Sequence, residues 1–380
     1  MNALPIARLF GFEIRIHVSW AIILAIITVS VVTQAGVLAP DASSELGWLI
    51  GGIIAAGFLL SALAHELGHA LAARRAGLPG GPVVVYVFGG AAGPDLETER
   101  ARDEATIALA GPLVSLAIGL LCTSVFGVTF VIGEAAAGAV TTIGRVAVVI
   151  GALNLLLGLI NLLPAYPLDG GRVVRAIVWH RTGDASQGLR AAATSGRWLG
   201  RLLAVVGLAV VLAVNALDGL FIAAFGWFLT TVAKAAERSA TVDDLLDGSV
   251  VEDVMDRDTT GVPAGLTLDT FADQLLAAEA PGAVPVVQDH EFIGMLGARQ
   301  VSRIRRGKWP TTRASDVAIA GDSMPTVTPA TSLRHVLDLL QQHTLDGLPV
   351  LVDGVFAGIV TKRAVAVLVR ERARERGVGP

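Results

Sequence analysis

Residues 48–69 read WLIGGIIAAGFLLSALAHELGH, an uncharged apolar run that ends in two histidines with a glutamate between them. A helix needs about 20 mostly apolar residues to cross the hydrocarbon core of a bilayer. Ionisable side chains at the end of such a run are expensive to place there, so they indicate a functional site. This one stretch therefore predicts a helical membrane fold and marks where its chemistry lies.

Further apolar runs lie on both sides of this stretch. Three long runs without any charged side chain lie at residues 18–40, 105–133 and 146–168. Two shorter runs follow at residues 202–217 and 219–233, and Asp218 separates them. By length and apolarity we expect about six transmembrane helices, of which the last two are the shortest.

The charged residues divide the chain into two parts. Of its 380 residues, 53% are apolar and 16% are charged, yet residues 1–236 hold 27 charged side chains and the shorter remainder holds 35. We predict a membrane domain at residues 1–236, a linker at residues 237–249 and a globular tail. The formal net charge of −4 argues against a nucleic-acid partner. The single cysteine, Cys122, excludes an intramolecular disulfide and a four-cysteine zinc site.

The segment HELGH at residues 65–69 has the HExxH spacing of a metal site on a helix. Residues four apart share a helix face, so both imidazoles can reach one tetrahedral zinc ion. Glu66 lies beside them, where it can take a proton from the attacking water. The alternative is a helix end whose histidines meet the membrane interface, with Glu66 paired to Arg74 or Arg75.

A third protein ligand is expected, because a catalytic zinc site keeps three protein ligands and one open position. The candidate is Asp169, in the segment NLLPAYPLDGG at residues 161–171. Pro164 and Pro167 interrupt the helix there, and two glycines after the aspartate permit a tight turn. Irregular backbone at membrane depth is tolerated where protein or water surrounds it, as a hydrolytic site requires. Taken alone, Asp169 could instead cap a helix after the proline break.

Together the two segments resemble the site-2 protease family of intramembrane zinc metalloproteases. The family pattern NxxPxxxxDG is met in full by residues 161–170, and the resemblance covers most of residues 1–236. It implies one Zn²⁺ per chain, held by His65, His69 and Asp169.

The resemblance also implies roles for two further side chains. Glu66 is expected to be the general base, and Asn161 to help hold the substrate or the tetrahedral oxyanion. An amide can donate to a developing oxyanion, although a hydrogen bond to nearby backbone explains Asn161 equally well. The segment AGPLVS at residues 110–115 resembles another part of the family, and its small residues would let helices approach closely.

A β-branched, glycine-bounded segment, GGPVVVYVFGGAAG at residues 80–93, is too short to span a membrane. We expect a short membrane-associated hairpin or re-entrant loop beside the site. An open strand edge there could pair with an extended substrate. A purely structural hairpin is the alternative.

The tail contains an internal repeat, which is typical of paired modules. Four segments of the first copy recur in the second: residues 251–255 with 314–317, 268–276 with 333–340, 284–286 with 348–350, and 293–296 with 357–360. Each copy reads as strand, helix, strand, strand, helix. The repeat resembles a pair of CBS domains, at residues 250–307 and 314–370. The expected fold class is therefore a multi-pass α-helical membrane protein with a C-terminal α/β tandem CBS module.

CBS pairs often bind adenine nucleotides through a Thr or Ser and an Asp after the final strand. This chain keeps Thr361 but has Ala364 at the position of the Asp, and the first copy has Gly297 and Gln300. Without a carboxylate for the ribose hydroxyls, we expect a structural, regulatory or homodimerising role at least as much as nucleotide binding.

The placement of Lys and Arg predicts the orientation in the cell membrane. The loops at residues 41–47 and around Asp218 contain none, whereas the loops on the other side are rich in Arg, and only Arg145 departs from the pattern. Both termini, the catalytic side and the CBS tail are thus expected in the cytoplasm.

The expected function is hydrolysis of a peptide bond in or near a transmembrane helix of a protein in the same bilayer. The resemblance implies regulated proteolysis, with an anti-sigma factor or pro-factor as substrate. The alternative is a CBS-gated ion transporter or channel that uses His65, Glu66, His69 and Asp169 as an ion pathway. Replacing Glu66 by Gln separates the two, because a protease keeps zinc and loses cleavage, whereas a transporter loses flux.

Overall fold

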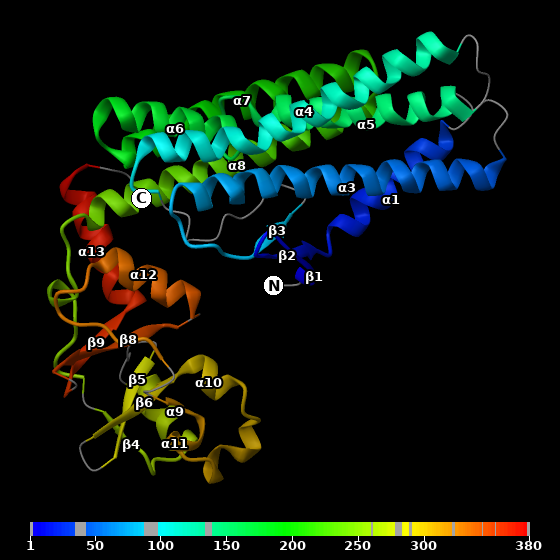
Figure 1. Cartoon of the computed structure of the whole chain (residues 1–380). Coiled ribbons are helices and arrows are strands. Elements are labelled where there is room, and N and C mark those ends of the chain that lie inside the picture. Colours follow the sequence, from blue (N-terminus) through cyan, green and yellow to red (C-terminus); the bar gives the residue numbers. More distant parts are fainter. Residues whose placement is uncertain are drawn as a thin grey trace. The chain divides into compact units, whose positions relative to one another are not determined.

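The chain divides into two compact units, Met1–Ala240 and Thr241–Pro380. The computed structural model describes residues 3–34, 43–86, 98–133, 139–259, 261–277, 283–288, 291–320, 324–343, 345–353 and 355–377. The first unit consists mainly of long helices, and the second mixes short strands and helices (Figure 1). This is the expected combination of a helical membrane part and an α/β tail.

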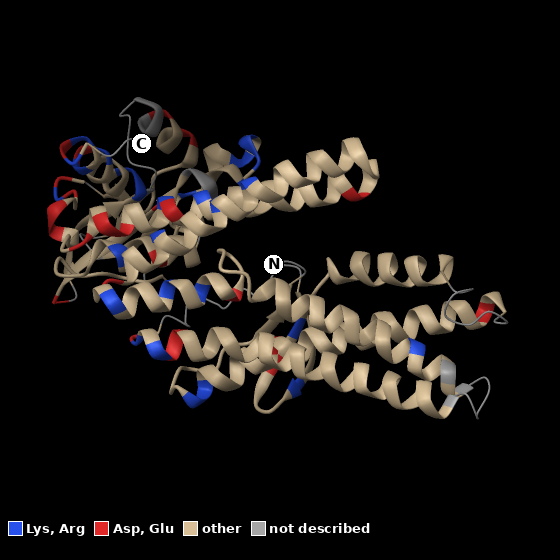
Figure 2. Cartoon of the chain, turned by 90° about the horizontal axis from the view of Figure 1, so that it is seen from above, with Lys and Arg blue, Asp and Glu red and all other residues tan. Residues whose placement is uncertain are grey.

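Within the described residues, five helices are long and apolar enough to cross a membrane. They are α3 (Ser44–Arg75), α4 (Ala101–Gly133), α5 (Ala139–Asn161), α7 (Ala185–Ala213) and α8 (Ala216–Leu246). Many of their large apolar side chains are exposed, such as Val131 at 75% and Leu212 at 80%, and Figure 2 shows their long uncharged stretches. Apolar surface of this extent suits lipid, so the chain is a multi-pass membrane protein.

Three expected spans differ in extent from the structure. The first, at residues 18–40, is described only as the 14-residue helix α1 (Trp20–Thr33), because residues 35–42 lie outside the described part. The last two are longer than expected, with the break between them at residues 214–215 and Asp218 in the first turn of α8. A helix satisfies its own backbone hydrogen bonds in water and in lipid, so it need not end where its apolar run ends.

A sheet with three described strands packs against α3. Strands β1 (Ala3–Leu9) and β2 (Phe12–His17) are antiparallel, and β3 (Val83–Val85) adds to β2 in parallel. Phe12 and Val83 are buried together with Leu67 of α3. The predicted hairpin at residues 80–93 is thus described only as one strand that pairs with a distant part of the chain, and residues 87–97 lie outside the described part.

Helix α6 (Asp169–Thr182) follows the proline-containing turn after α5 and packs against α4 and α7. It ends at Gly183, whose φ of 76° is a left-handed conformation that favours glycine. Asp184 then caps α7 by accepting hydrogen bonds from the backbone nitrogens of Ser186 and Gln187. This short connection sets α6 directly against α7.

The described strands of the second unit form one sheet of four strands and one of two. The first has β4 (Val262–Pro263), β5 (Ala283–Gln288), β6 (Glu291–Gly297) and β7 (Ile319–Ala320), and the second has β8 (Gly347–Val352) and β9 (Val355–Thr361). The helices of this unit are α9 (Leu268–Ala277), α10 (Ala298–Ser302), α11 (Ala314–Val317), α12 (Leu333–Gln342) and α13 (Lys362–Glu375), with short 3-10 turns η2 (Val251–Asp253) and η3 (Arg306–Thr311). Pairs β5–β6 and β8–β9 have equivalent registers, with Val284 opposite Leu296 and Leu348 opposite Val360. The sequence repeat is therefore a structural repeat.

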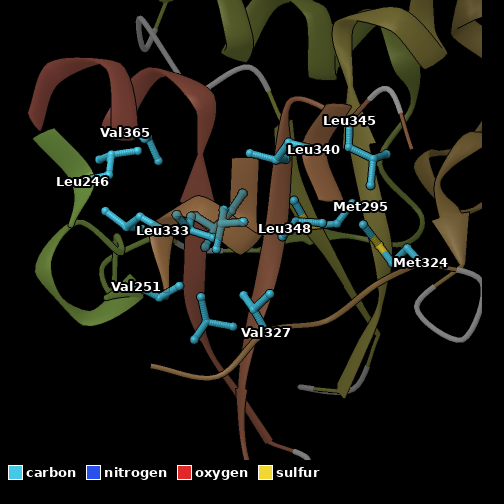
Figure 3. Close-up of a cluster of buried hydrophobic side chains, with 14 residues drawn as sticks. Leu246, Val251, Met295, Met324, Val327, Leu333, Leu340, Leu345, Leu348 and Val365 are labelled. Carbon is cyan, nitrogen blue, oxygen red and sulfur yellow. The ribbon is translucent and has the colours of Figure 1, made fainter. Parts of the chain in front are cut away.

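The leading segment of each copy packs on the core of the other copy. Val251 lies in the cluster built around Leu348 of the second copy (Figure 3). Ala314, which opens the second copy, lies in the cluster built around Leu268 of the first. The two copies interlock in this way, so the tail folds as one module.

Candidate metal centre

Two histidines and one aspartate meet in the interior of the first unit. His65 and His69 lie one turn apart on α3 and share a face, and Asp169 is the first residue of α6. All three are buried, and none is more than 9% exposed. One potential ligand atom from each lies within 4.8 Å of the others. The structure thus brings the three predicted ligands together from two segments about 100 residues apart in the sequence.

The three donor atoms form a triangle with equal sides. Asp169 Oδ2 lies 3.2 Å from His65 Nε2 and 3.2 Å from His69 Nε2, and the two nitrogens are 3.2 Å apart. Ligand atoms placed tetrahedrally at about 2.0–2.1 Å from a zinc ion are about 3.3 Å from one another. The donor set and its spacing therefore fit zinc.

Helix α4 orients both imidazoles from outside the triangle. His69 Nδ1 lies 2.7 Å from the carbonyl oxygen of Ile107, and His65 Nδ1 lies 2.9 Å from Ser115 Oγ. A carbonyl can only accept, so Nδ1 of His69 carries a proton and Nε2 is the ring nitrogen that faces the other two ligands. Hydrogen bonds of this kind fix the orientation of imidazole ligands and strengthen metal binding.

At Gly111, helix α4 passes close to both histidine rings. A Cβ at this position would lie 2.3 Å from His69 Nε2 and 2.8 Å from His65 Cδ2, too close for any side chain to fit without displacing the rings. The small residues at 110–115 therefore do more than allow helices to approach, because position 111 leaves the metal-facing nitrogens uncovered.

The turn before α6 places Asp169. A Cβ on the next residue, Gly170, would lie 2.3 Å from the carbonyl oxygen of Leu163, so the chain can fold back this tightly only with glycine there. The backbone nitrogen of Tyr166 donates to the carbonyl of Ala192 on α7 at 3.2 Å, which anchors the turn. The glycines and the anchor together bring Asp169 to the face of α3.

Glu66 and Asn161 lie outside the triangle. Glu66 follows His65 on α3 and is half-buried. Asn161 is the last residue of α5, and its amide nitrogen donates to the carbonyl of Leu157 at 2.9 Å. This is the local backbone bond that was the alternative for Asn161, and its role toward substrate stays a prediction. Sequence reasoning missed the partners of the histidine Nδ1 atoms, since a backbone carbonyl such as that of Ile107 leaves no signature in the sequence.

Comparison with known proteins shows similarity along nearly the whole chain. The model of peptidase family M50 matches residues 53–149 and 130–196, and that of the CBS domain matches residues 314–371. A Mycobacterium tuberculosis protein named "Putative zinc metalloprotease Rip3" is 33% identical over 97% of this chain and 93% of its own length. Zinc metalloprotease MJ0392 of Methanocaldococcus jannaschii is 25% identical over 95% of each chain. The solved site-2 protease from Methanocaldococcus jannaschii is 24% identical, covers 62% of this chain and 95% of its own, and has a TM-score of 0.40.

Proposed function

The chain belongs to peptidase family M50, and from this membership we propose that it hydrolyses a peptide bond in or near a transmembrane helix of a membrane-bound protein. It is a zinc metalloprotease, as are its full-length relatives by name. The observation that carries the proposal is the buried donor triangle of His65, His69 and Asp169 among helices long enough to cross a membrane. Similarity to metalloproteases favours proteolysis over the ion-transport alternative.

Each residue of the site has a distinct proposed role. His65, His69 and Asp169 hold one zinc ion, which when bound supplies a Lewis acid for the scissile carbonyl and the attacking water. Glu66 accepts the proton of that water and returns it to the leaving amine. Asn161 exchanges its bond to the backbone of its own helix for one to the developing oxyanion.

The small sheet suggests how the substrate is held. Among the described strands, β3 lies at the edge of its sheet, and Val83 of this strand packs against Leu67, which lies between the two histidines. A peptide must be extended to be cleaved, and a sheet edge binds extended peptides through backbone hydrogen bonds. The substrate is therefore proposed to add to the sheet along β3, after its own helix has unwound locally.

Charge at the helix ends supports a cytoplasmic orientation of the site. Arg74 and Arg75 end α3 after the HELGH segment, whereas Glu45 lies in its first turn at the opposite end. Positive loops stay in the cytoplasm, so the N-terminus, the site and the CBS tail are proposed to face it. Cleavage on that side would release a cytosolic fragment, which suits a regulatory substrate such as an anti-sigma factor or pro-factor.

The CBS module is proposed to regulate the protease or to join two copies in a homodimer. Thr361 caps α13 by accepting from the backbone nitrogen of Ala364 at 3.2 Å, and Ala364 has no carboxylate for a ribose. Sedimentation of the detergent-solubilised chain with and without AMP tests this role. A dimer that does not respond to AMP supports the dimerising role, whereas tight AMP binding would assign the module to regulation by a nucleotide.

Cleavage of a co-expressed single-span reporter tests the catalytic proposal. Glu66→Gln should keep its zinc and lose at least about 100-fold in cleavage rate, because the general base is removed while the ligands remain. Glu45→Gln is the matched control, since Glu45 lies on the same helix at its other end. Wild-type rates in Glu66→Gln, or purified wild type without zinc, would overturn the proposal.

A further inference from the structure

A buried carboxylate close to the metal centre takes no part in the proposed chemistry. Glu104, in the first turn of α4, is only 2% exposed. Its Oε1 lies 3.0 Å from Arg172 Nε and 3.7 Å from Arg175 Nη1, and its Oε2 accepts from the Thr98 hydroxyl at 3.0 Å. Both arginines belong to α6, so this cluster ties the start of α4 to α6.

Each side of this ion pair lies one helical turn from a residue that supplies or orients a proposed metal ligand. Glu104 precedes Ile107 by three residues, and the carbonyl of Ile107 is the partner of His69 Nδ1. Arg172 follows Asp169 by three residues on α6. Residues three apart lie on the same side of a helix. The pair therefore joins the turn of α4 that precedes the Ile107 carbonyl to the turn of α6 that begins with Asp169.

The energetics of buried charge explain what such a pair can do. A buried ion pair adds little net stability, because the loss of hydration offsets the attraction. Leaving one of its charges without a partner is strongly destabilising. The pair therefore favours one separation of α4 and α6 over others. Arg172 also interacts electrostatically with Asp169 and Glu66, so its position contributes to the field at the site.

We propose that Glu104 and Arg172 are positioning residues of the metal centre, which hold α4 and α6 at the separation at which His69 and Asp169 reach the same ion. The inference rests on the proposed zinc site and adds residues that the HExxH and NxxPxxxxDG patterns do not contain. The pair acts through helix turns and not on the reacting atoms. Its loss should therefore weaken zinc binding and turnover and leave substrate binding unchanged.

The test is the zinc dissociation constant of the full-length chain in detergent, measured by competition with a graded chelator. Glu104→Gln keeps the shape of the side chain and removes its charge, and it should weaken zinc binding by about 10-fold, the lower end of the loss seen when a direct partner of a ligand is removed. With the purified chain in detergent and increasing amounts of a purified single-span reporter, kcat should fall while KM stays constant. Glu237→Gln is the matched control, because Glu237 Oε2 pairs with Arg197 Nη1 at 2.8 Å and joins α8 to α7. The zinc affinity of this control should equal that of the wild type.

A conservative series keeps the inference testable if Glu104→Gln does not fold. Arg172→Lys retains the charge without the Nε contact, and Arg172→Met removes both, so zinc binding should weaken in that order. A purely structural role would lower the melting temperature without changing the zinc affinity of the folded protein, and that result would overturn the inference. Wild type without zinc would instead refute the proposed function, so the two failures are distinguishable.

Discussion

Replacing Gly111 by alanine should expel zinc from the site and leave the helices folded. The new Cβ would lie 2.3 Å from His69 Nε2 and 2.6 Å from His69 Cε1. Non-bonded atoms of this kind settle about 3.5 Å apart, so the ring must retreat by about 1.2 Å. Zinc–ligand distances tolerate a change of only about 0.2 Å. The overpacking itself costs about 1–3 kcal/mol, which a folded chain can absorb.

The assay is zinc content per chain after dialysis against a chelator series, with thermal unfolding measured on the same samples. Gly111→Ala should bind zinc more than about 100-fold more weakly than the wild type. This loss is larger than the one expected when a hydrogen bond to a metal ligand is removed. Gly127→Ala is the matched control, because it lies on the same helix and its Cβ meets no atom within 4 Å. Wild-type zinc affinity in Gly111→Ala would show that α4 does not pack against the metal-binding nitrogens, and would refute the reasoning.

Three further predictions probe the site and the packing around it. Ser115→Ala removes the hydroxyl that lies 2.9 Å from His65 Nδ1. Zinc affinity, measured by chelator competition, should therefore fall about 10–100-fold. An unchanged affinity would mean that Ser115 does not orient the ring. Asn154→Leu removes an amide that donates to Ser61 Oγ at 3.0 Å between α5 and α3. The free energy of unfolding in mixed micelles should fall by about 0.6 kcal/mol and by less than about 2 kcal/mol, and a larger loss would contradict a simple interhelical bond. Leu348→Ala leaves a cavity at a fully buried position of the tail. The free energy of unfolding of that unit should fall by about 2–5 kcal/mol, and the zinc content should not change. Loss of zinc would show that the site depends on this core.

The sequence could predict the metal ligands because their spacing obeys local geometry. His65 and His69 lie four residues apart on a helix, so their common face follows from the helix period alone. Asp169 was predictable from the prolines and glycines around it and from the family pattern. Its contact with α3 depends on packing that no local rule contains.

The residues that orient the ligands could not be predicted from the sequence. Gly111 and Ser115 read only as small residues that permit close helix packing, and their contacts with the histidines arise from how α4 lies against α3. In the sequence, Glu104 is only a charged residue near the start of a helix. Its burial against α6 is visible in the structure alone. The parallel pairing of β3 with β2 is similarly a long-range contact. Span ends also escaped prediction, because hydropathy marks where lipid is favourable and not where a helix ends.

The zinc X-ray absorption spectrum of the purified chain tests most directly whether His65, His69 and Asp169 hold the metal. We expect one zinc per chain with nitrogen and oxygen ligands only, at about 2.0–2.2 Å, and loss of that zinc in Asp169→Ala. A sulfur ligand at about 2.3 Å, or full zinc content in Asp169→Ala, would contradict this assignment.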